Sequence, residues 1–153
     1  MNKTIVTQER GKVLPMQRLY MEEIKIQTRK TGFTETFFGR KRYFEGINSK
    51  IPFIRASAER MAINAPIQGT EADMVKIAMI NIFEFLQKEK LSDQAKLILQ
   101  VHDELVYEVD LDQAEKLEGK IKELMENVLP LTKTSGVPIL ATSVICNNLA
   151  DAK

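Results

Sequence analysis

Two adjacent carboxylates, Asp103 and Glu104, stand between two short apolar runs, residues 96–101 and 105–109. The Leu, Ile and Val content of these runs predicts two strands joined by a tight turn. Such a turn holds the carboxylates on a stiff support, where they repel each other unless a cation lies nearby. Magnesium takes oxygen ligands, commonly from one or two carboxylates and substrate phosphates. The pattern indicates either a magnesium-dependent phosphoryl-transfer site or an ordinary turn in which Asp bonds the local backbone.

His102, the only histidine of the sequence, directly precedes the acidic pair. We call His102, Asp103 and Glu104 together the acidic tip. A histidine beside a turn is either a site residue or simply a hydrogen-bonding partner of its neighbours. The first apolar run carries large apolar side chains on both faces, which predicts a strand buried between two layers.

Three polar side chains, Arg60, Asn64 and Gln68, recur at intervals of four, and we call them the donor stripe. Apolar spacing predicts helix over about residues 53–90, with a kink or break at Pro66, which lacks an amide donor. If Pro66 only kinks the helix, the stripe lies along one face. Such side chains reach base acceptors in the minor groove at every base pair, and so hold a duplex without reading its sequence. The alternative is a solvated helix face.

The elements around these residues predict an α+β fold. A charged helix is expected from Met16 to Lys30, ended by Gly32. Aromatic and β-branched runs then predict a small hairpin, Phe33–Phe38 with Lys41–Phe44. A last strand is expected from Val137 to Cys146, which is rich in Val, Ile and Thr.

Composition and charge limit the class of protein. The 153 residues are 44% apolar and 28% charged, which is ordinary for a globular chain. No apolar run is long enough for a membrane span or a signal peptide, and the single cysteine excludes an internal disulfide, so we expect a cytoplasmic protein. Residues 1–60 carry 13 Lys and Arg against 6 Asp and Glu, whereas residues 61–153 carry 9 against 15. The basic half indicates either a surface for a polyanion or scattered solvated charge.

The order of three sequence strings carries a family resemblance. These strings are GFTETFFGRKRY at residues 32–43, AERMAINAPIQGTEADMVKIAMI at residues 58–80 and LQVHDELVYEV at residues 99–109. Together they resemble the C-terminal palm region of the family A DNA polymerases, the bacterial DNA polymerase I type. The resemblance covers residues 15–153 and leaves residues 1–14 as an unmatched tail.

The resemblance implies a fold and a catalytic centre. It implies an antiparallel palm-type sheet, made of the hairpin called motif C and a C-terminal strand, packed on helices, with a further small hairpin near the N-terminus. Asp103 would be a magnesium ligand and Glu104 a supporting carboxylate, so both are assigned to the metal site. His102 would lie near the primer terminus.

The resemblance also implies DNA contacts and a reaction. Arg60, Asn64 and Gln68 match the positions that follow the minor groove of the primer–template. Arg40 and Arg42 would add phosphate contacts, although on that hairpin a solvated-charge role is the alternative. The implied chemistry is attack of a primer 3′-hydroxyl on the α-phosphate of a deoxynucleotide, with pyrophosphate leaving.

Two parts that the family needs for catalysis have no counterpart in this sequence. We find neither the first palm motif, which supplies another metal carboxylate, nor the fingers helix that holds the nucleotide. We therefore expect the isolated chain to be an inactive part of a DNA polymerase that binds magnesium weakly or not at all. Three explanations stay open: a part that works with an N-terminal polymerase portion, a non-catalytic DNA-binding module, or a polymerase gene remnant.

Overall fold

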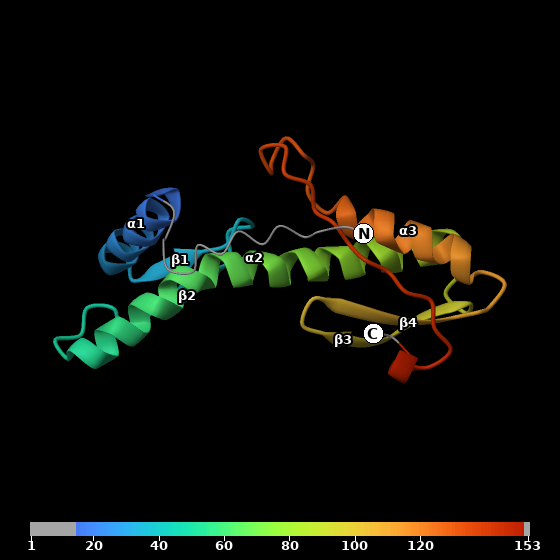
Figure 1. Ribbon diagram of the computed structural model, residues 1–153, viewed down its shortest axis with the longest axis horizontal. Helices are drawn as coiled ribbons and strands as arrows, with labels where there is room; N and C mark the ends of the chain where they lie inside the picture. Colours follow the sequence, from blue (N-terminus) through green and yellow to red (C-terminus); the bar gives the residue numbers. More distant parts are fainter. Residues whose placement is uncertain (1–14, 152–153) are drawn as a thin grey trace, which may run out of the picture. The chain divides into compact units, whose positions relative to one another are not determined.

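Three α-helices and two small hairpins account for most of the regular structure in the computed structural model, which describes residues 15–151. The two hairpins are separate antiparallel sheets, so the α+β class is confirmed. The described residues divide into two compact units, 15–69 and 70–151. The elements labelled in Figure 1 are α1 (Pro15–Thr31), β1 (Phe33–Glu35), β2 (Lys41–Tyr43), α2 (Pro52–Lys88), β3 (Ala95–Val101), β4 (Glu104–Val109), α3 (Ala114–Glu126) and a short 3-10 helix, η1 (Leu149–Asp151).

The end of α1 confirms the predicted break at Gly32. This glycine has a φ of 83°, a left-handed conformation that only a residue without a Cβ adopts freely. Its amide donates to the carbonyl of Thr28 at 2.7 Å and closes the last turn of the helix. The amide of Phe44 then donates to the carbonyl of Gly32 at 2.9 Å. The end of the hairpin is thereby tied to the end of α1.

The predicted hairpin near the N-terminus exists, but its strands are shorter than expected. Phe33 pairs with Tyr43 and Glu35 with Lys41, so only three residues of each strand enter the ladder. Phe37 and Phe38 lie in the connecting loop, where their rings make an exposed edge-to-face contact. Their aromatic character predicted a strand, whereas the loop is fixed by the amide of Thr36 donating to the carbonyl of Arg40 at 2.9 Å.

The core of the first unit is built from small residues on α2. Three alanines of that helix, with Phe44 and Ile47 from the segment after β2, form the buried cluster. A Cβ on Gly46 would approach the side chain of Ile54 to 2.8 Å, so this segment lies directly against the start of α2. The buried alanines are Ala58, Ala62 and Ala65.

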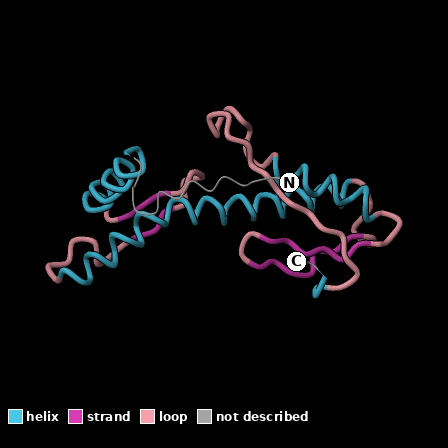
Figure 2. The backbone as a smooth tube through the Cα atoms, viewed as in Figure 1, coloured by secondary structure: helices cyan, strands magenta, loops and turns pink. Residues whose placement is uncertain are grey.

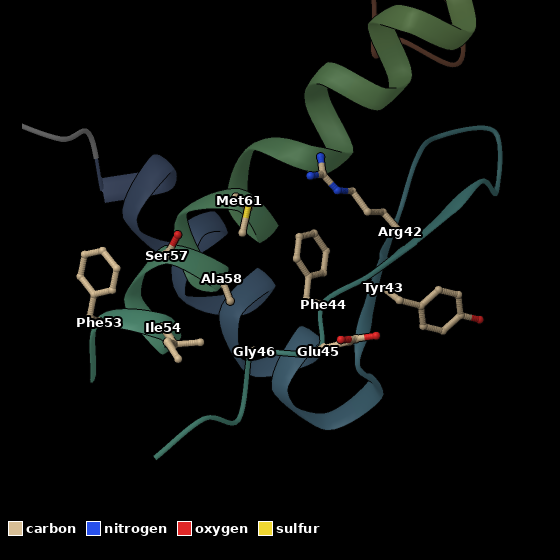
Figure 3. Close-up of a pocket in the computed structure, with 10 residues that line it drawn as sticks. All are labelled: Arg42, Tyr43, Phe44, Glu45, Gly46, Phe53, Ile54, Ser57, Ala58 and Met61. Atoms are coloured by element: carbon tan, nitrogen blue, oxygen red, sulfur yellow. The ribbon is translucent and has the colours of Figure 1, made fainter. Parts of the chain in front are cut away.

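An open cavity of about 410 Å³ lies beside this core (Figure 3). Phe44, Ile54 and Met61 line it together with Ala58, and its polar members include Arg42. The cavity is therefore mostly apolar, which fits its position between the end of the hairpin and the first turns of α2.

Of the kink or break predicted at Pro66, the break is wrong. α2 runs without interruption from Pro52 to Lys88, and Thr70 lies within it. A proline inside a helix costs about 3 kcal/mol, because it removes one hydrogen bond and crowds the preceding turn. Ala62 and Ala65 lie in the helical turn that precedes Pro66, and both are buried. Burial of these two side chains offsets the cost of the proline. Among the described residues, no helix is both long and apolar enough to cross a membrane.

In the second unit, the β3–β4 hairpin and α3 pack against the C-terminal part of α2 (Figure 2). Ile82 and Leu86 of α2 meet Leu117 of α3 and Ala95 of β3, and all four are buried. The apolar side chains packed around them come from α2, β4 and α3, apart from Leu91, which lies in the turn between α2 and β3. They are Phe85, Leu91, Leu105, Tyr107, Val109, Ile121, Leu124 and Met125.

The expected C-terminal strand is wrong, because no strand is assigned between residues 137 and 146. The amide of Ala141 donates to the carboxylate of Glu126 at 3.0 Å, and the hydroxyl of Ser143 donates to the carboxylate of Glu118. Both acceptors belong to α3. The segment is thus held by side chains of a helix instead of by the backbone of a neighbouring strand.

Two glycines within helices give opposite predictions. Replacing a helical glycine by alanine usually stabilises by about 0.5–1 kcal/mol, and around Gly119 a Cβ meets nothing within 4 Å. Around Gly69 it would meet the side chain of Thr36 at 2.6 Å. We expect Gly119→Ala to raise the free energy of unfolding by that amount and Gly69→Ala to lower it, as measured by urea titration. Equal stabilisation by both would show that the hairpin does not lie against α2.

Burial of the Tyr107 phenol predicts a pH dependence of stability. Burial raises the pKa of Tyr107 from its ordinary value of 10.0 to about 12. The pKa of Tyr107 is higher in the folded state than in the unfolded state. The contribution of Tyr107 to the free energy of unfolding is therefore complete below pH 10 and is lost as the pH rises towards 12. The free energy of unfolding should fall less steeply over this range in Tyr107→Phe than in the wild type. Tyr43→Phe, which alters an exposed ring, is the control and should follow the wild type.

Candidate functional site

The acidic tip lies at the end of the predicted hairpin. Val101 pairs with Glu104, so His102 and Asp103 form a two-residue turn between β3 and β4. Glu104 is the first residue of β4 instead of a turn residue. The prediction of a short turn carrying the tip between two strands is confirmed.

His102 adopts a backbone conformation that is costly for its residue type. Its φ is 52°, in the left-handed region that two-residue hairpin turns require and that glycine or asparagine usually supplies. A side chain with a Cβ pays on the order of 1–2 kcal/mol there. The amide nitrogen Nε2 of Gln100 donates to the carbonyl of His102 at 2.6 Å and supports this conformation. Gln100 was not among the residues predicted from the sequence, although it is the single polar residue in the run LILQV.

The two carboxylates of the tip are exposed and supply few metal ligands. Carboxylate oxygens match the ligand preference of a hard cation, but a two-ion centre needs several of them on rigid elements. Within residues 15–151, no group of three or more His, Cys, Asp or Glu residues gathers to hold a metal. Asp103 and Glu104 therefore do not make such a centre by themselves.

The donor stripe forms one exposed face of α2. Because the helix continues through Pro66, the four-residue spacing of Arg60, Asn64 and Gln68 is kept, and all three side chains are exposed. The buried alanines of the same helix face the core of the first unit. The prediction that the three side chains share one face required that Pro66 does not break the helix, and this condition is satisfied.

Arg40 joins the donor stripe, whereas Arg42 does not. The guanidinium of Arg40 donates to the carbonyl of Gly69 at 3.0 Å, which brings Arg40 to the end of the stripe next to Gln68. The guanidinium of Arg42 lies 5.4 Å from the ring centre of Phe44 and borders the apolar cavity. The sequence placed both arginines on one hairpin but did not distinguish these two environments.

The charge around the stripe is positive. Residues 15–69 carry ten Lys and Arg against five Asp and Glu. Glu59, which precedes Arg60, is bound by the guanidinium of Arg29, and this hydrogen bond raises the pKa of Arg29. Arg55 lies 3.9 Å from the same carboxylate. The negative charge of Glu59 is therefore offset by two arginines outside the stripe.

The candidate residues thus form two groups. Arg60, Asn64, Gln68 and Arg40 gather in the first unit, and the acidic tip lies in the second. The first group supplies cationic and amide donors on a helix face. The second supplies two exposed carboxylates on a two-residue turn.

The family model and the sequence relatives of this chain all point to the same family of proteins. The family model described as DNA polymerase family A matches residues 12–151. The chain is 44% identical to the thermostable DNA polymerase I of Thermus thermophilus over 117 residues. These aligned residues make up 76% of this chain and 14% of that protein. It is 41% identical over 138 residues to DNA polymerase I of Rhizobium leguminosarum, or 90% of this chain and again 14% of the relative.

A solved structure agrees with these sequence relatives. It is the POL domain of Pol1 from M. smegmatis in complex with DNA primer-template and dNTP, with a TM-score of 0.72 and 41% identity. The match covers 79% of this chain and 20% of that one. The chain thus spans a small part of the length of the proteins it matches. With a family model that covers nearly all of its residues, the chain belongs to the family A DNA polymerases.

Proposed function

We propose that this chain forms part of a DNA-directed DNA polymerase that synthesises DNA on a template during replication or repair. The observation that carries the proposal is the likeness to a POL domain bound to DNA primer-template and dNTP, at 41% identity. The donor stripe supports it independently, because its exposed side chains suit contact with a duplex. DNA as the partner favours a cytoplasmic location.

The donor stripe and Arg40 would hold the primer–template. Guanidinium and amide groups at four-residue spacing lie about 6 Å apart along a helix, close enough to reach successive base pairs from the minor groove. Arg40 lies at the end of this row, where a cation meets the phosphate backbone. Arg42, stacked over Phe44, would reach only phosphates that pass the hairpin.

The acidic tip would contribute to the catalytic centre. In the proposed reaction, the primer 3′-hydroxyl attacks the α-phosphate of a deoxynucleotide and pyrophosphate leaves. Asp103 and Glu104 would supply part of the oxygen ligands of magnesium, and His102 would lie beside the primer terminus. Because two carboxylates are too few for a two-ion centre, we propose that other polymerase segments of the kind its relatives carry supply the remaining ligands and the nucleotide contacts.

Removal of the stripe should weaken DNA binding without changing sequence preference. Arg60→Ala combined with Gln68→Ala removes one charge and one amide, so we expect roughly tenfold weaker binding to AT-rich and GC-rich duplexes alike. The slope of log affinity against log salt should become shallower by about one. Fluorescence anisotropy over a salt series measures both quantities.

The matched control is Lys76→Ala with Gln87→Ala, which removes the same kinds of group from exposed positions further along α2. We expect this control to bind DNA more tightly than the stripe variant. Equal weakening in the two variants would reduce the stripe to a solvated helix face. Wild-type protein that binds no duplex in low salt would remove the proposed DNA contact altogether.

Magnesium should stabilise the isolated chain very little. With two exposed carboxylates, the cation keeps most of its water and binds above millimolar concentration, adding less than about 0.4 kcal/mol. Asp103→Asn should lie within about 0.5 kcal/mol of the wild type, because exposed charges interact weakly. Thermal melts at low micromolar protein, with and without millimolar magnesium, measure both effects. A large magnesium-dependent rise in melting temperature that Asp103→Asn abolishes would show that the chain completes a metal site alone.

A further inference from the structure

The side chain of Gln100, near the end of β3, contacts the turn that carries the acidic tip. The sequence predicted that β3 is buried between layers, and that prediction is wrong, because every residue of the strand after Ala95 is exposed. An exposed side chain can reach forward along the strand instead of packing against a second layer. The Nε2 of Gln100 donates to the carbonyl of His102, two residues further on, at 2.6 Å.

The carbonyl of His102 lies outside the hydrogen-bond ladder of the hairpin. The ladder closes with the pair Val101–Glu104, so the two turn residues have no cross-strand partner. A backbone carbonyl without a ladder partner must accept from water or from a side chain. Gln100 supplies such a donor from the strand that leads into the turn.

This carbonyl belongs to the central peptide of the turn, which joins His102 to Asp103. Because the peptide bond is planar, the carbonyl of His102 and the amide of Asp103 rotate together. A type I′ turn has a positive φ at both central residues, whereas a type II′ turn has one only at the first, and the two types differ in the direction of the central peptide. His102 has a φ of 52° and Asp103 a negative φ, as in a type II′ turn.

The residue types of the turn do not favour this direction by themselves. A type II′ turn ordinarily has glycine at its first central position, whereas Asp is common in type I′ turns. The direction of the central peptide also sets φ at Asp103, and the rotamers that a side chain can adopt depend on its φ and ψ. A contact that fixes the central peptide therefore restricts where the Asp103 carboxylate can point.

We propose that Gln100 is a positioning residue of the acidic tip, which holds the central peptide of the turn in one of two directions and thereby restricts the rotamers of Asp103. The inference rests on the proposed function, in which Asp103 supplies oxygen ligands to magnesium. Groups that orient a metal ligand from behind contribute to the metal site without touching the metal. Gln100 acts in this way through the backbone of His102.

Removal of the donor should release the central peptide. Gln100→Met keeps the length of the side chain but cannot donate, so the ratio of the two directions should shift between about twofold and tenfold, the factor that one hydrogen bond carries. The amide protons of His102 and Asp103 lie close together in a type I′ turn and apart in a type II′ turn. The NOE between them, measured by NMR on the isotope-labelled chain, should be weak in the wild type and stronger in Gln100→Met.

The matched control is Gln87→Met, which makes the same exchange at an exposed position of α2. It should leave this NOE weak. Gln100→Glu covers the case in which methionine disturbs the strand, because glutamate has the shape of glutamine and carries no donor at neutral pH. Thermal melts show which variants keep the fold. A strong NOE already in the wild type, or a weak one in both Gln100 variants, would overturn the proposal.

Glycine at position 102 should make Gln100 dispensable. Glycine adopts the first position of a type II′ turn without strain, so Gln100→Met combined with His102→Gly should show the weak NOE of the wild type. A role of Gln100 in the stability of β3 alone would not be rescued from position 102. A double variant that keeps the strong NOE would overturn the action of Gln100 through His102.

DNA binding separates this inference from the proposed function. Gln100 and the donor stripe lie in different units, so Gln100→Met should bind a duplex with wild-type affinity in fluorescence anisotropy. Weakening as large as that of the stripe variant would make Gln100 a DNA contact and would overturn its positioning role. Wild-type protein that binds no DNA would remove the proposed DNA contact but would leave the NMR result unchanged.

Discussion

The close packing of small residues on α2 is the constraint on which the first unit depends. Ala58, Ala62 and Ala65 admit the segment after β2 to the helix surface, and Gly69 admits the β1–β2 hairpin. The same contacts keep α2 helical through Pro66, so the donor stripe stays in register. A larger side chain at Gly69 would move Thr36 and, with it, the hairpin that carries Arg40.

The acidic tip depends on a different kind of constraint, which is local. A two-residue turn joins β3 to β4, and His102 accepts a left-handed backbone that its side chain disfavours. The side chain of Gln100 offsets part of that cost through the carbonyl of His102. Strained turns of this kind are often found where a side chain must be presented, which agrees with the proposed role of the tip.

The second unit leaves apolar surface exposed where the family resemblance predicted a larger sheet. β3 is exposed along most of its length, and the segment expected to be a third strand is held by Glu126 and Glu118 of α3. A strand is stabilised by hydrogen bonds to the backbone of a neighbouring strand, so an apolar run without such a neighbour does not form a strand.

The sequence alone determined the features that depend on local chemistry or on long motifs. It predicted the end of α1 at Gly32, both hairpins and the family, because glycine conformation, β-propensity and residue order act over short stretches. Tertiary structure decided the continuity of α2 at Pro66, since burial of its alanines outweighs the local cost. It also decided the loss of the strand at residues 137–146, the separation of Arg40 from Arg42 and the exposure of β3. Each of these depends on which distant element lies alongside, and local sequence does not encode that.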